Sequence, residues 1–263
     1  MENSMNKWIR PFLIFVSAGQ FFFAVAFFFQ WSFATDLWPF PGTTPLTFIF
    51  VASIFAAAAA PTLWVAINQR FDLLAGIGLD YLTILTPMTV ILFRLSASGE
   101  TRMTVYGIVC LLGSLFGLAL FVWGLRIPMK KTLPTPGFVR GAFAFFIIAL
   151  LIVSTRLLLQ IPTIPWALTP ELSLLVGWMF IGAAFYFVYG LLRPDWMNAA
   201  GQLLGFLAYD IVLIVPFIKR LPNTPAEQMN GMIVYTLVVI FSGLLAVYYL
   251  FLSPKTRAKT WSG

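Results

Sequence analysis

The stretch FLIFVSAGQFFFAVAFFF, residues 12–29, decides the fold class of this chain, because none of its positions carries a charge. A helix needs about 20 mostly apolar residues to cross the hydrocarbon core of a membrane, and this run continues to Trp31. The apolar core of a secretory signal peptide is shorter, at about 7–15 residues. We therefore interpret the stretch as a first membrane span that stays in the protein.

Seven more stretches along the chain have a similar length and composition. We expect eight membrane spans, at approximately residues 12–31, 45–67, 73–93, 103–125, 138–158, 170–192, 196–217 and 231–252. The segments between them are short, which leaves no room for a soluble domain. The sequence thus predicts an all-α polytopic membrane protein.

The composition of the chain agrees with this prediction. Of its 263 residues, 60% are hydrophobic and 10% are charged, and the mean hydropathy is +0.93. Soluble domains carry about 25% charged residues, so this chain has too few to cover a surface that faces water. The lipid bilayer is therefore its expected partner. Nucleic acid is not, although the formal net charge is +7, because the basic residues lie between apolar runs and form no single stripe.

The basic residues also indicate how the chain is oriented. With the amino terminus inside, eleven of the 16 lysines and arginines fall on the cytoplasmic side, including the pair Lys130–Lys131. Membrane proteins show this bias in general. The tryptophans agree, with Trp31 and Trp166 at outer span ends and Trp64 and Trp196 at inner ends, where amphipathic rings settle. We expect an integral protein of a bacterial-type plasma membrane with both termini in the cytoplasm.

Short motifs recur at a spacing of about 123–130 residues, which indicates an internal duplication. The turn 70–72 (Arg-Phe-Asp) joins the expected second and third spans, and the turn 193–195 (Arg-Pro-Asp) joins the sixth and seventh. Gln30 closes the first span as Gln160 closes the fifth. Each half holds four spans, an even number, so both halves enter the membrane in the same direction.

The predicted architecture is two tandem four-helix units in parallel orientation. The first unit covers residues 1–127, a cytoplasmic linker covers residues 128–137, and the second unit covers residues 138–263. Two interpretations of this duplication stay open. It gives one helix bundle a permanent partner, or it creates a binding site between the two halves.

Two carboxylates lie well inside the expected spans, Asp80 in the third and Asp210 in the seventh. A charge at that depth is costly and is usually paired, protonated or placed in a wet cavity. Arg156 shares a leaflet with Asp210, so the two could form an ion pair, or Arg156 could extend to the headgroups alone. Asp80 has no basic residue at its depth. Its candidate hydrogen-bond donors are Tyr81, Gln20 and Gln202.

Glycines mark two faces where helices can approach closely. In the seventh span Gly201 and Gly205 are four residues apart, so they share a face. In the fourth span Gly113 and Gly117 have the same spacing. The face of the fourth span fits packing within the bundle and dimerisation equally well.

No motif in the sequence marks an enzyme, a cofactor or a metal site. Histidine is absent and Cys110 is the single cysteine, which removes the commonest protein ligands of haem, zinc and copper. The sequence has no His-Glu-x-x-His, no Gly-x-Ser-x-Gly and no phosphate loop. An intramembrane aspartyl hydrolase needs two carboxylates at one depth, whereas Asp80 and Asp210 are expected in opposite leaflets.

Two hypotheses for the function remain. In the first, the protein is a structural or accessory subunit that packs in the bilayer with a larger membrane complex or with itself. In the second, it is a small-solute or proton-coupled permease with a polar path along the seventh span, where Gln202 and Tyr209 accompany Asp210. Asp80, Gln20 and Arg156 are further candidates for that path. The same polar side chains also fit hydrogen bonds that only hold helices together.

Overall fold

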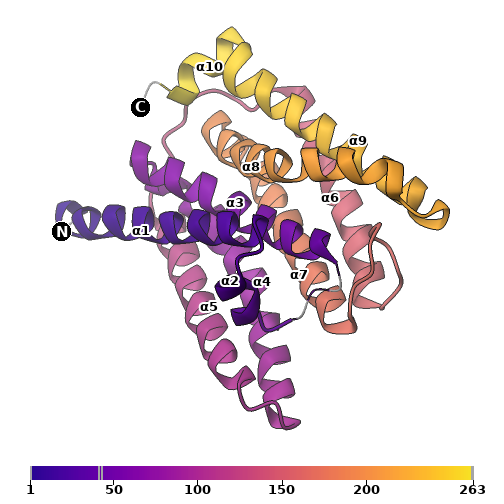
Figure 1. The fold of residues 1–263 in the computed structure, drawn as a ribbon. Coiled ribbons are helices and arrows are strands. Elements are labelled where there is room, and N and C mark those ends of the chain that lie inside the picture. Colours follow the sequence, from indigo (N-terminus) through magenta and orange to yellow (C-terminus); the bar gives the residue numbers. More distant parts are fainter. Residues whose placement is uncertain (1, 41, 43, 262–263) are drawn as a thin grey trace.

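The computed structural model of the protein describes residues 2–40, 42 and 44–261. Within these residues every regular element is a helix, and eight of the helices are long and apolar enough to cross a membrane (Figure 1). The prediction of an all-α integral membrane protein with eight spans is confirmed. The long helices are α1 (Glu2–Phe28), α3 (Pro45–Asn68), α4 (Leu74–Ala97), α5 (Met103–Arg126), α6 (Gly137–Leu158), α7 (Pro170–Leu192), α8 (Trp196–Arg220) and α9 (Ala226–Val247).

Short helices add detail that the hydropathy pattern does not predict. Helix α2 (Ser32–Leu37) follows the first span, and helix α10 (Pro254–Trp261) follows the last. Among the described residues there are also two single turns of 3₁₀-helix, η1 (Phe71–Leu73) and η2 (Leu221–Asn223), and one turn of π-helix, η3 (Tyr248–Leu252). None of these segments is long enough to cross a bilayer, so a search for apolar runs passes over them.

Three long helices end at a glutamine with left-handed backbone geometry. The φ angles of Gln30, Gln69 and Gln160 are 52°, 52° and 60°. The amide after Gln30 and the amide after Gln160 each donate, at 2.9 Å, to the carbonyl five residues earlier. This hydrogen bond is part of the Schellman motif, which satisfies carbonyls that a helix end leaves free. The first and fifth spans therefore end in the same way.

Helices α3 and α7 form the centre of the molecule. Along the first four spans, 28%, 56%, 39% and 22% of the residues in the most apolar stretch are buried, and along the last four 28%, 56%, 39% and 33%. The main packed pairs are α4 with α5, α1 with α3, α6 with α7, α3 with α8, α4 with α7 and α8 with α9. The least buried helices, α1, α5, α6 and α9, thus turn most of their apolar side chains outward.

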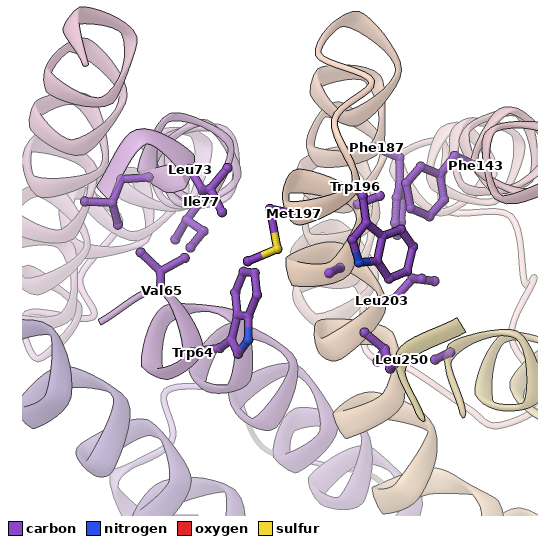
Figure 2. Packing of buried hydrophobic residues seen from close by; sticks show 14 of the residues in the cluster. Trp64, Val65, Leu73, Ile77, Phe143, Phe187, Trp196, Met197, Leu203 and Leu250 are labelled. Carbon is purple, nitrogen blue, oxygen red and sulfur yellow. The ribbon is translucent and has the colours of Figure 1, made fainter. Parts of the chain in front are cut away.

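The first four spans meet the last four where α3 packs on α8 and α4 packs on α7. We call this contact, between residues 45–97 and 170–220, the central interface. In the structure the linker covers residues 127–136, one residue earlier than predicted. Near it, Trp64 of α3 lies beside Met197 of α8 (Figure 2). Farther from the linker, the ring of Phe50 makes edge contacts with Phe180 and Tyr209 at centroid distances of 5.8 and 6.1 Å. Large side chains therefore fill much of the interface.

Glycine allows α4 and α5 to approach closely. A Cβ atom placed on Gly78 would lie 2.6 Å from the carbonyl oxygen of Gly117, and one placed on Gly113 would lie 2.6 Å from the side chain of Leu85. Real Cβ atoms do not come this near to other heavy atoms. The glycine face of the fourth span therefore packs inside the chain, against the third span.

The glycine face of α8 lies in the central interface. A Cβ atom on Gly205 would lie 3.1 Å from the carbonyl oxygen of Ala57 on α3. One on Gly201 would lie 3.4 Å from the hydroxyl group of Tyr186 on α7. These two glycines let α8 fit between the two central helices.

Candidate functional site: polar groups of the central interface

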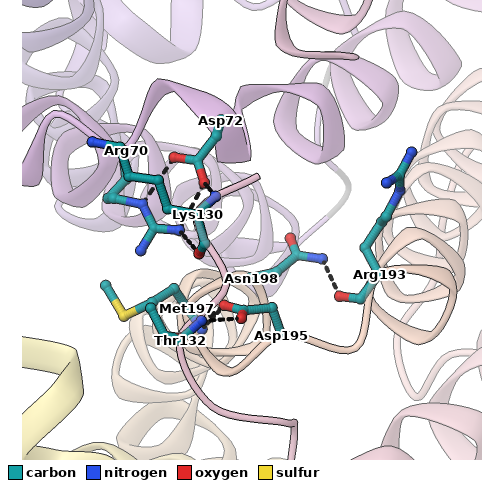
Figure 3. A network of polar contacts seen from close by, with 8 residues as sticks. All are labelled: Arg70, Asp72, Lys130, Thr132, Arg193, Asp195, Met197 and Asn198. Carbon is teal, nitrogen blue, oxygen red and sulfur yellow. Dashed lines mark hydrogen bonds and ion pairs between the residues drawn. The ribbon is translucent and has the colours of Figure 1, made fainter. Parts of the chain in front are cut away.

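The turns before α4 and α8 each hold the linker through an aspartate (Figure 3). Asp72 accepts a hydrogen bond from the Lys130 amide at 3.0 Å, and Asp195 accepts from the amide and the hydroxyl of Thr132 at 2.6 and 2.8 Å. Arg70 donates to both oxygens of Asp72, at 2.8 and 2.7 Å. These contacts fasten both halves to the linker, and we call this end of the bundle the linker side.

A hydrogen-bonded network crosses three helices of the first half. Tyr81 of α4 is buried, and its hydroxyl group lies 2.9 Å from Nε2 and 3.3 Å from Oε1 of Gln20 on α1. The same hydroxyl lies 3.2 Å from the Thr62 hydroxyl on α3. Tyr81 and Gln20 are thus engaged with each other, and Thr62 is a member that the sequence did not reveal.

Asp80 lies next to this network and faces the second half. A Cβ atom on Gly182 of α7 would lie 2.7 Å from its Oδ1 atom, so the carboxyl group fits against α7 where that helix has no side chain. The Oδ1 atom is buried and has no hydrogen-bond partner among the described residues. The expected donors to Asp80, which were Tyr81, Gln20 and Gln202, all bond elsewhere.

Gln202 joins α8 to α7 within the second half. Its Nε2 atom donates to the carbonyl oxygen of Tyr186 at 2.6 Å, while its Oε1 atom is buried without a partner among the described residues. The side-chain amide lies against Gly190, where any Cβ atom would overlap it. Gln202 therefore joins two helices through its amide nitrogen, while its amide oxygen stays free. The first feature fits a structural role, and the second fits a position on a polar path.

Asp210 belongs to a second cluster, between α8 and α9. Its Oδ1 atom accepts a hydrogen bond from Ser242 at 3.0 Å, and its Oδ2 atom is buried without a partner among the described residues. The neighbouring Tyr209 hydroxyl is hydrogen-bonded to the hydroxyl of Tyr235. Ser242 was not predicted, because no sequence pattern links residues on two helices that are 32 positions apart.

The hypothesis of an Arg156–Asp210 ion pair is wrong. Arg156 is exposed, and its Nε atom donates to the hydroxyl group of Thr163 at 3.3 Å. Among the described residues the ion pair is that of Arg70 with Asp72. The other alternative, in which Arg156 extends to the headgroups, stays a prediction, and the exposure of the side chain is compatible with it.

The aspartates of α4 and α8 lie at different depths. Asp80 is the seventh residue of α4 and Asp210 the fifteenth of α8, and both helices begin on the linker side. At 1.5 Å per residue, Asp80 lies roughly 9 Å and Asp210 roughly 21 Å along its helix. The two carboxyl groups therefore do not share one site.

Two surface cavities lie apart from these carboxyl groups. The larger has a volume of about 400 Å³ and is lined by Gln30, Thr35, Asp36, Trp38, Gly42, Phe48 and Arg102. The smaller has a volume of about 250 Å³ and is lined by Phe138, Phe241, Leu244, Leu245, Tyr248 and Tyr249. Neither lining includes Asp80 or Asp210; Asp210 is buried, whereas Asp80 is half-buried, with its Oδ1 atom on the buried side.

Fold and site together define a class of protein, an eight-span helical membrane protein with buried acceptor groups where its halves meet. Comparisons with protein-family models, with curated proteins and with solved structures find no match for this chain. The chemistry of the polar groups is therefore the basis for inferring the function.

Proposed function

We propose that the protein is a small-solute or proton-coupled permease with a polar path through the central interface. The observation that carries this proposal is the buried Oδ1 atom of Asp80, which lies where α4 meets α7 and has no hydrogen-bond partner among the described residues. Most buried polar groups that stabilise a fold are hydrogen-bonded, as Asp72 is to Arg70. Asp80 is one of several exceptions among the described residues, and it is the carboxyl group that lies where α4 meets α7, which suits a partner that binds reversibly.

The free acceptors indicate what such a partner must offer. A buried acceptor without a donor costs roughly 1–3 kcal/mol, and more if it is charged. Asp80 avoids this cost when it binds a proton or accepts a hydrogen bond from a solute, and intramembrane carboxyl groups serve both roles in transporters. Across the interface the Oε1 atom of Gln202 is a second free acceptor. The path is therefore suited to protons or to small hydrogen-bond donors such as protonated amines.

We further propose that the halves are duplicated units in parallel orientation, with the linker side in the cytoplasm. The packing supports this. If α3 corresponds to α7 and α4 corresponds to α8, the two pairs that join the halves, α3 with α8 and α4 with α7, are equivalent to each other. The buried share of successive spans begins 28%, 56% and 39% in both halves. Since the Oδ1 atom of Asp80 is buried against α7, we propose that a solute reaches it when the halves move at the central interface, as repeats do in many transporters.

The test is a flux measurement in proteoliposomes that contain a trapped pH-sensitive dye. Protons and methylammonium are the probes, each driven by an imposed gradient. We expect flux from the intact protein and at least a tenfold lower flux from Asp80→Asn, because the amide cannot carry a proton. Glu227→Gln removes an exposed carboxylate from the start of α9 and is the matched control, with unchanged flux expected.

Each outcome decides between the proposals. Full flux from Asp80→Asn would exclude Asp80 from the path. A folded protein that conducts neither probe above the level of empty liposomes would overturn the permease and favour the alternative of a structural or accessory subunit. Purification from native membranes with identification of bound proteins would then be the next measurement.

A further inference from the structure

A groove on the linker side lies between the start of α6 and the end of α9. It has a volume of about 250 Å³, and its lining is carbon-rich, with two tyrosine hydroxyls as the polar side-chain groups. Phe138 and Leu244 are 62% and 65% exposed, so the groove opens to the outside of the bundle. It is smaller than the roughly 300–1,000 Å³ of typical small-molecule sites, which favours a slender apolar ligand.

Backbone features keep this groove open. Helix α9 changes into the π-turn η3 at Tyr248, and the wider turn places Tyr248 and Tyr249 at the end of the groove. On α6, Gly141 is exposed one turn after Phe138, and a Cβ atom on it would meet no heavy atom within 4 Å.

The short helix that follows the groove residues Tyr248 and Tyr249 is basic. The Thr256 hydroxyl of α10 donates to the carbonyl oxygen of Tyr249, a groove residue, at 2.6 Å. Lys255 and Arg257 flank Thr256 and are exposed, and so is Lys259. Trp261 fastens the far end of α10 through a 3.0 Å bond to the Leu250 carbonyl. Helix α10, which carries these basic residues, is therefore fastened to the backbone of the segment that lines the end of the groove.

In the part of the chain that the structure describes, no hydrogen bond or ion pair joins a carboxylate to these basic residues. From residue 228 to residue 261 the sequence contains no acidic residue. Asp72 and Asp195, which lie on the same side of the bundle, are bonded to Arg70 and to the linker. Arg140, two positions after Phe138, is exposed and adds a further positive charge. An anion is the complementary ligand for this end of the groove.

We propose that the groove and helix α10 together bind one anionic phospholipid, with an acyl chain among the aromatic rings and the phosphate group near Lys255 and Arg257. Basic clusters directly beside a membrane span attract anionic headgroups. The apolar groove adds a second contact that a soluble anion cannot use. This inference does not depend on the proposed transport function.

Native mass spectrometry of the protein in detergent tests the proposal. The probes are dioleoyl phosphatidylglycerol, dioleoyl phosphatidylcholine and soluble glycerol 3-phosphate. We expect phosphatidylglycerol to bind about tenfold more tightly than phosphatidylcholine, and glycerol 3-phosphate not to compete. The triple variant Lys255→Gln, Arg257→Gln, Lys259→Gln should lose this preference. Leu244→Trp, which fills the groove, should weaken the binding of both lipids by a similar factor.

Matched variants separate this site from general effects. Arg94→Gln, Arg102→Gln and Lys219→Gln together remove the same charge from exposed positions that do not border the groove, and Leu237→Trp adds the same bulk two turns earlier on α9. Both controls should bind lipid as the wild type does. Equal binding of the two lipids to the wild type, or competition by glycerol 3-phosphate, would overturn the proposal. An unchanged preference in the α10 triple variant would overturn it as well.

Discussion

Ser242 donates a hydrogen bond of 3.0 Å to Asp210 and thereby joins α9 to α8 inside the apolar part of the bundle. The other carboxyl oxygen has no partner among the described residues, and the Ser242 hydroxyl shares its single proton with the Val238 carbonyl oxygen at 2.8 Å. We expect Ser242→Ala to lower the free energy of unfolding by about 1–3 kcal/mol, because a buried acceptor loses its donor. Chemical denaturation in detergent measures the change.

A double-mutant cycle checks that Asp210 is the partner concerned. Ser242→Ala and Asp210→Asn should be non-additive by about 0.5 kcal/mol or more, because they alter one shared contact. Arg156→Gln should add independently to Asp210→Asn, since the guanidinium group bonds Thr163. A large coupling of Asp210 to Arg156 and none to Ser242 would contradict the structure.

At the scale of single residues, the sequence identifies the polar side chains inside the spans more readily than it identifies their hydrogen-bond partners. Asp80, Asp210 and Gln202 stand out because polar side chains are rare within apolar spans. Their partners depend on the rotation of each helix and on which helices touch. Ser242 and Thr62 look like ordinary small polar residues in the sequence, so nothing there identified them as partners.

Among the helices, α4 and α5 show most clearly how small residues set a packing distance. Gly78 faces the backbone of α5, and a Cβ atom there would lie 2.6 Å from the carbonyl oxygen of Gly117. Gly78→Leu should destabilise the protein by about 1–3 kcal/mol or more, because the two backbones would have to separate. Thermal unfolding followed by circular dichroism measures this effect.

Gly19 provides the control for this prediction. It lies within α1, and a Cβ atom on it would meet no heavy atom within 4 Å. Gly19→Leu should therefore leave the melting temperature unchanged or raise it, since leucine favours a helix more than glycine does. Similar losses of stability in both variants would show that the leucine destabilises either helix for a reason other than the close approach of α5.

The long helices were predictable and their pairing was not. A span is a local property, because about 20 apolar residues in succession identify it. The approach of α3 to α8 and of α4 to α7 joins segments more than 70 residues apart, and no repeated spacing encodes it. The glycines of the fourth span illustrate the difference, because their spacing predicted a close contact but did not identify its partner.

On the scale of the whole molecule, the linker lies where the two halves are fastened together. Asp72 accepts a hydrogen bond from the Lys130 amide and Asp195 accepts one from the Thr132 amide. Each half is therefore hydrogen-bonded to the linker, one on either side of Lys131. The sequence predicted the linker and the two turns of similar composition. It did not predict that these turns meet there, because that contact depends on how the halves associate.

This arrangement predicts how the linker responds to protease. Asp195→Ala removes both hydrogen bonds to Thr132 and the cap bond of 3.0 Å to the Met197 amide. Local opening of the linker should then become easier, and trypsin should cleave after Lys131 about tenfold faster, since cleavage follows the population of the open form. Intact-mass analysis of a digestion time course measures the rate.

The other aspartate should behave differently, because it has a buried cation as its partner. Asp72→Ala leaves Arg70 buried without its counter-ion, which typically costs about 3–5 kcal/mol, so this variant should lose global stability as well as speed cleavage. Asp36→Ala removes an exposed carboxylate far from the linker in the sequence and should change neither quantity. If Asp195→Ala were cleaved no faster than Asp36→Ala, the remaining backbone bonds, such as that from the Trp196 amide to the Leu133 carbonyl, would be sufficient to hold the linker.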